Sequence, residues 1–126
     1  MSMKQYQKSV VAFLRETGLP VYHSGQVPTG AGFPFITLTT AYAPFTQSAA
    51  ITVTAWFRGE NAHTRCVEMM DRLCAAIPQE GTLLRYHGGM AVLHRAAGSF
   101  VTLVTDETDR RIIGGRMRLN VHLYDA

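Results

Sequence analysis

Five histidines and two cysteines are the side chains of this 126-residue chain best suited to hold a metal ion. The histidines are His23, His63, His87, His94 and His122. No two of them stand at the close spacing of a ligand pair, and the cysteines do not form a C-x-x-C motif. We expect His87 and His94 to flank a Gly-Gly turn and to face each other across a hairpin as an exposed pair. A metal protein therefore stays an alternative hypothesis, and we predict no cofactor.

The two cysteines, Cys66 and Cys74, fall on one predicted helix. Eight residues of helix separate them by about 12 Å, which is too far for a disulfide. Free thiols on a buried helix face suit a reducing compartment. The N-terminal segment lacks the long apolar core and cleavage site of a signal peptide, and no stretch approaches the ~20 apolar residues of a membrane span. We expect a protein made in the cytoplasm, without a membrane partner.

Nucleophilic catalysis would need a serine or cysteine beside a histidine and a carboxylate. None of the serines stands in a G-x-S-x-G elbow. The carboxylates Asp106, Glu107 and Asp109 cluster in a predicted turn, where we expect them to pair with Arg110 and Arg111. The sequence predicts that the protein is not an enzyme, and a small enzyme is kept only as an alternative.

The last predicted strand, residues 116–124, carries the best candidate for a binding stripe. Apolar and polar residues alternate along it, so that Arg116, Arg118, Asn120 and His122 share one face. Such a basic strand face can meet a phosphate backbone. A small nucleic-acid-binding module is therefore an alternative function, and a polar outer face or an interface with an acidic partner is the plainer interpretation.

Composition indicates one domain spanning residues 1–126 and favours an oligomer. Lys and Arg number 12 against 9 for Asp and Glu, a formal charge of +3 that does not by itself imply nucleic acid. Charged residues make up 17% of the chain, below the roughly 25% that is usual. A surface with few charges is often partly buried against other chains.

One strand followed directly by one helix forms the predicted core. Alternation over residues 49–58 predicts a strand, and apolar residues at helical spacing predict a helix over residues 61–77. Asn61 is the expected N-cap of this helix. Cys66 and Met70 are expected on its buried face.

The remaining segments predict one more helix and further strands. They are a helix at 3–17, a short strand at 21–23, a strand at 34–43, a hairpin at 82–96 around Gly88-Gly89, and strands at 100–105 and 116–124. Gly114-Gly115 is expected to form a bulge or bend before the last strand. The order predicts an α+β fold: a mostly antiparallel β-sheet with long hairpins, covered on one face by two helices.

Three segments carry a family resemblance. They are PFITLTTAYAP at 34–44, AAITVTAWFRGENAHTRCVEMMDRLCAAI at 49–77 and GRMRLNVHLYD at 115–125. The order of elements and these segments resemble the small tail-terminator and tail-completion proteins of long-tailed bacteriophages and prophages. In that family a strand that ends in an aromatic residue precedes a polar turn and an Ala-rich helix, and the chain closes on an Arg-rich strand.

The resemblance implies a structural protein of the virion, assembled in the cytoplasm of the host bacterium. It implies a homo-oligomeric, hexameric ring that caps the tail tube, contacts tail-tube and head-completion proteins, and lets DNA pass through its lumen without sequence-specific binding. It implies no catalytic site. The candidate interface residues are Tyr42, Pro44, Phe45, Trp56, Asp106, Glu107, Asp109, Arg110, Arg111, Arg116, Arg118 and His122.

Overall fold

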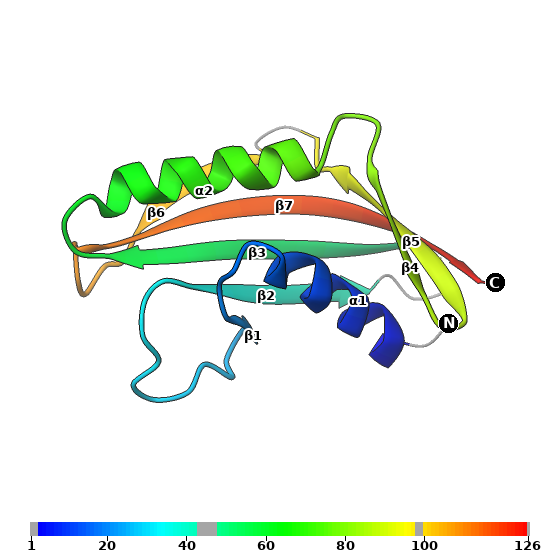
Figure 1. The fold of residues 1–126 in the computed structure, drawn as a ribbon, viewed down its shortest axis with the longest axis horizontal. Helices are drawn as coiled ribbons and strands as arrows, with labels where there is room; N and C mark the ends of the chain where they lie inside the picture. Colours follow the sequence, from blue (N-terminus) through cyan, green and yellow to red (C-terminus); the bar gives the residue numbers. More distant parts are fainter. Residues whose placement is uncertain (1–2, 43–47, 98–99, 126) are drawn as a thin grey trace.

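The computed structural model describes residues 3–42, 48–97 and 100–125, and it has the predicted α+β fold (Figure 1). Its elements are α1 (Met3–Arg15), β1 (Val21–His23), β2 (Phe35–Tyr42), β3 (Ser48–Arg58), α2 (Ala62–Ala76), β4 (Thr82–Tyr86), β5 (Gly89–Arg95), β6 (Val101–Thr105) and β7 (Ile112–Asp125). The strands form one curled sheet in the order β1-β2-β3-β7-β5-β4, and β6 pairs with β7. All neighbours are antiparallel except β1 and β2, which are parallel.

The centre of the sheet is the pair of long strands β3 and β7. Ile51 lies opposite Leu119, and Val53 lies opposite Met117. These four side chains point toward the helices and are almost completely buried. Because side chains alternate along a strand, this register sends the intervening threonines and arginines to the other side of the sheet.

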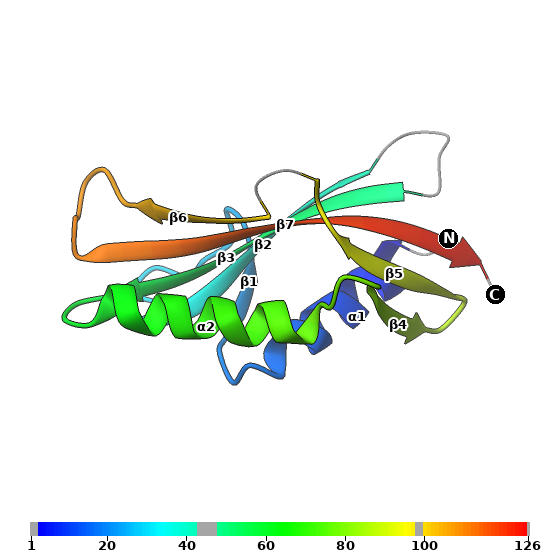
Figure 2. The same cartoon turned by 90° about the horizontal axis from the view of Figure 1, so that it is seen from above.

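Both helices lie on the same side of the sheet (Figure 2). The α2 helix packs on β3 and β7, and its buried face includes Cys66 and Met70, as predicted. The α1 helix packs against β4, β1 and β5 through Tyr6, Val10 and Leu14. Within the described residues, no helix is both long and apolar enough to cross a membrane.

The last strand is longer than predicted, because Gly114 and Gly115 continue it. Both residues are paired in register with β3 on one side and β6 on the other, so the expected bulge is wrong. A Cβ at Gly114 would lie 2.8 Å from the ring of Trp56, and one at Gly115 would lie 2.6 Å from the sulfur of Met70. The two glycines therefore allow close packing on both faces of the sheet.

Asn61 is the N-cap of α2, as expected, although its φ of 62° is left-handed and its side chain makes no capping hydrogen bond. The predicted Gly88-Gly89 loop, in contrast, is wrong by one residue. The β4–β5 hairpin pairs Tyr86 with Gly89, so its two-residue loop is His87-Gly88, one residue earlier than expected. His87 consequently lies in the loop and does not face His94. Gly88, with φ of 95°, provides the conformation that the turn requires.

Candidate interaction surface on the outer face of the sheet

The outer face is the side of β2, β3 and β7 that points away from the two helices. Its members alternate with the buried core residues along each strand. They are Phe35, Thr37, Thr39 and Ala41 on β2, then Ser48, Ala50, Thr52, Thr54, Trp56 and Arg58 on β3, then Ile112, Gly114, Arg116, Arg118, Asn120, His122 and Tyr124 on β7. Three adjacent strands thus present hydroxyl groups, small side chains and cations on one surface.

An open depression of about 280 Å³ lies in the middle of this face. Its lining consists of Ser24, Thr37, Thr39, Thr52, Thr54, Trp56, Arg116 and Arg118. The indole N–H of Trp56 donates a hydrogen bond of 3.1 Å to the hydroxyl oxygen of Thr37. The Trp56 ring also lies close over Gly114. These contacts fix the indole, so the depression has a rigid wall.

The two arginines of β7 stand in this depression without an acidic partner. Arg116 is half-buried and Arg118 is exposed. Neither guanidinium makes an ion pair or hydrogen bond with any residue that the structure describes. Arg58 and Arg111, in contrast, both bind Asp109. Arg116 and Arg118 are therefore free to bind an external anion.

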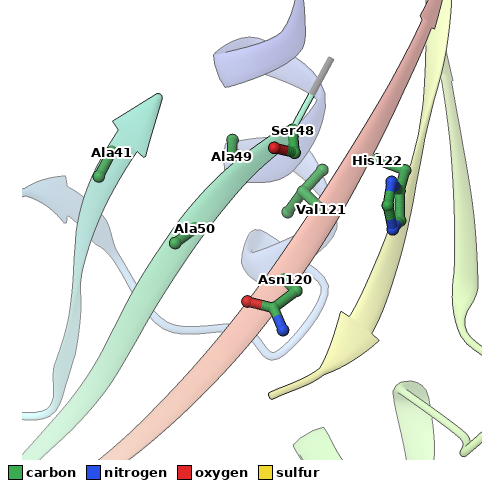
Figure 3. A pocket seen from close by; sticks show the side chains of 7 residues that line it. All are labelled: Ala41, Ser48, Ala49, Ala50, Asn120, Val121 and His122. Atoms are coloured by element: carbon green, nitrogen blue, oxygen red, sulfur yellow. The ribbon is translucent and has the colours of Figure 1, made fainter. Parts of the chain in front are cut away.

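A second open depression, of about 450 Å³, lies toward the other end of the same strands (Figure 3). It is lined by Ala41, Ser48, Ala49, Ala50, Asn120, Val121 and His122. Figure 3 shows Asn120 and His122 on β7 beside the small side chains of β3. The His122 ring also meets the His94 ring of β5 edge-on, with centroids 5.6 Å apart. The small side chains on β2 and β3 thus leave a depression beside the polar groups of β7.

The turn between β6 and β7 is held by two aspartates. Asp106 accepts hydrogen bonds from the hydroxyl and N–H of Thr108 and from the N–H of Asp109. These bonds, first of all the one from the Thr108 hydroxyl, lower the pKa of Asp106. Asp109 binds the guanidinium groups of Arg111 and Arg58 at 3.1 and 3.2 Å. Hydrogen bonding from Arg111 lowers the pKa of Asp109 to about 2.

The predicted interface residues divide into three places. Trp56, Arg116, Arg118 and His122 share the outer face. Those of the 106–111 segment lie at the end of the sheet where β3 ends, with Arg58 holding the turn to that strand. The pairing of Asp109 with Arg111 is confirmed. Among the described residues, Asp106 and Glu107 form no ion pair with Arg110 or Arg111, so the expectation is wrong for these two carboxylates and for Arg110. Glu107 is exposed.

The remaining candidates are Tyr42, Pro44 and Phe45. Tyr42 is the last residue of β2, and its side chain lies outside the described part of the structure. Pro44 and Phe45 also lie outside the described residues. Sequence reasoning missed the hydroxyl groups of Thr37 and Thr52. Their alternation with apolar residues was visible, but their position beside the arginines depends on the register between strands.

The side chains that could bind a metal do not cluster among the described residues. Among residues 3–42, 48–97 and 100–125, no three His, Cys, Asp or Glu side chains lie close enough to hold a metal ion. Burial raises the pKa of the Cys66 thiol, and it also raises the pKa of Cys74. Both cysteines are free, and both belong to the packing of α2.

Comparison with known proteins assigns this chain to no family. No protein-family model matches this chain, and no curated protein sequence matches it.

Proposed function

We propose that this chain is a structural subunit that assembles with copies of itself into a ring, as tail-terminator proteins of long-tailed phages do. One observation carries the proposal: β6 is a sheet edge without the usual protection against pairing. Among the described residues, β6 pairs only with β7. Its sequence, VTLVT, contains no charge, proline or glycine. Proteins that must avoid edge-to-edge association place such residues on their edges.

The backbone of β6 offers hydrogen-bonding groups to a further strand. The N–H of Arg118 donates to the carbonyl of Phe100, and the N–H of Asp106 donates to the carbonyl of Ile112. The direction of the backbone hydrogen bonds alternates along an antiparallel strand. The N–H and C=O groups of Val101, Leu103 and Thr105 therefore point away from β7. The Leu103 side chain is also 40% exposed. A strand added here would satisfy these groups and cover this leucine.

The opposite edge of the sheet differs from the β6 edge. There β1, only three residues long, pairs with β2 alone among the described strands. Contact between two different surfaces of identical subunits is heterologous, and it closes into a ring when the rotation between neighbours is suitable. Unlike edges on opposite sides of one sheet are consistent with such a contact.

The phage role within this proposal rests on the sequence resemblance of residues 34–44, 49–77 and 115–125. The subunit would act in the virion at the head–tail junction, after assembly in the bacterial cytoplasm. Its partners would be copies of itself, the tail-tube protein and a head-completion protein, with DNA passing through the lumen. In this role the chain performs no catalysis.

Size-exclusion chromatography with light scattering tests the proposal. The wild-type chain is expected to form one oligomer of fixed size at high concentration, or on addition of tail-tube protein. A chain that stays monomeric in both conditions contradicts the proposal. The variant Leu103→Lys places a charge on the β6 edge and is expected to remain monomeric.

The matched control is Val67→Lys. Val67 is 37% exposed on α2, so the change again replaces an exposed apolar side chain with lysine, but on a helix and not on a sheet strand. This variant is expected to assemble like the wild type. If both variants lose assembly equally, or if neither does, β6 is not the contact strand.

A further inference from the structure

We infer that the depression lined by Arg116 and Arg118 is a binding site for the phosphate backbone of nucleic acid. This inference does not depend on ring assembly, because every group that it uses belongs to one subunit. The site lies on three adjacent strands, β2, β3 and β7, so its side chains are presented by the most extensively paired part of the sheet.

Charge is distributed asymmetrically over the molecule. None of the outward-facing residues that the structure describes on β2, β3 and β7 is acidic. The carboxylates of the described side chains belong instead to the helices and to the turns. Two unpaired guanidinium groups on this surface attract an anion, and no described carboxylate on the same surface repels it.

The two arginines are placed to act together. They are two residues apart on β7 and point to the same side, which separates their Cα atoms by about 7 Å along the strand. Arg116 is half-buried, and its guanidinium group lacks a partner among the described residues. Guanidinium groups bind phosphate oxygens in a bidentate manner.

Hydroxyl groups complete the donor set around the guanidinium groups. Thr52, which is half-buried, lies opposite Arg118. Thr54 lies opposite Arg116 but is itself buried, so it belongs to the floor of the depression. The hydroxyl oxygen of Thr37 accepts a bond from Trp56, which leaves its own O–H to be donated to a ligand. Arginine and threonine are among the residues that usually contact phosphate oxygens.

The same chemistry favours nucleic acid over an acidic protein. Protein interfaces centre on apolar or aromatic side chains that become fully buried. In this depression Trp56 is the one aromatic residue of the lining, and its ring already packs over Gly114. The remaining lining is polar; Thr54 is buried, and the other residues are half-buried or exposed. Because the contacts are with phosphate, we expect binding without base specificity.

Fluorescence anisotropy with a labelled oligo(dT) tests the inference on the isolated full-length chain. Binding is expected to weaken steeply between about 50 mM and about 200 mM salt. The double variant Arg116→Glu, Arg118→Glu is expected to bind at least about tenfold more weakly. Its plot of log affinity against log salt should be shallower by about 1.4, which is about 0.7 for each phosphate that is no longer bound. Unchanged affinity and slope would overturn the inference.

Three comparisons keep the result interpretable. The variant Lys8→Glu, Arg15→Glu makes the same change in charge on exposed residues of α1, and it is expected to keep most of the affinity. If it loses as much as the β7 variant, the binding is not located on the outer face. Arg118→Glu alone, at an exposed position, is expected to show part of the loss without disturbing Arg116. Polyglutamate is expected to compete poorly; if it competes as well as unlabelled oligo(dT), the site belongs to an acidic protein.

Discussion

At the scale of single residues, Asp109 holds the β6–β7 turn to the end of β3. Its carboxylate binds Arg111, two residues away, and Arg58, which is 51 residues away in the sequence. The pairing with Arg111 could be predicted from sequence, because the two residues share a short charged turn. The pairing with Arg58 could not, because it follows from the register in which Arg58 lies opposite Ile112.

The variant Asp109→Asn should show how this carboxylate affects stability toward acid. The pKa of Asp109 is lowered from 3.8 to about 2, chiefly by hydrogen bonding from Arg111, so the folded chain keeps the carboxylate ionised at pH values where the unfolded chain protonates it. The contribution of the ionised carboxylate to the free energy of unfolding is complete above about pH 4. It is lost as the pH falls through about 2, where the folded chain also protonates Asp109. Urea unfolding should therefore find the wild type more stable near neutral pH, with the difference narrowing between about pH 4 and about pH 2. A difference that stays constant over that range contradicts this role.

At the scale of elements, Arg95, a residue of β5, caps the C-terminal end of α2. Its guanidinium donates to the carbonyls of Ile77 at 2.8 Å and Cys74 at 3.0 Å, and it stacks over the Phe100 ring at 4.9 Å. The last turn of α2 has no basic residue of its own. A cation at this end complements the helix dipole. It also adds a second donor to the carbonyl of Cys74, which accepts the N–H of Ile77 at 3.2 Å.

Replacing Arg95 with alanine is expected to reduce the free energy of unfolding by about 1–2 kcal/mol, because two charge-assisted hydrogen bonds to the helix end are removed. Urea denaturation followed by circular dichroism measures this. Arg85→Ala is the matched control: Arg85 is an exposed arginine on the neighbouring strand β4, and its loss is expected to change stability by less than about 0.5 kcal/mol. Equal effects of the two substitutions would rule out a specific cap.

Element boundaries were predictable where side-chain periodicity decided them. The strand at 49–58 and the helix at 61–77 agree with β3 and α2 to within one residue at each end. The start of β7 was not predictable, because Gly114 and Gly115 are typical of a break in a strand. In the fold they are required instead by the Trp56 ring on one face and by Met70 on the other.

At the scale of the whole molecule, the sheet has one face covered by helices and one face open. This fold class was predictable, because two amphipathic helices and several alternating strands have few ways to bury their apolar sides. The position of β5 and β6 along the same edge of β7 was not, since local patterns do not specify which distant strands pair. The open face and the β6 edge therefore emerge only from the three-dimensional structure.

Native mass spectrometry tests whether the chain forms a closed assembly through a sheet edge. Wild type and Leu103→Lys would be measured in parallel over a wide concentration range, each alone and with tail-tube protein. We predict one closed oligomer at a single multiple of 13.9 kDa for the wild type and monomer for the variant. Wild-type monomer in every condition, or an open-ended series of masses, would contradict the account.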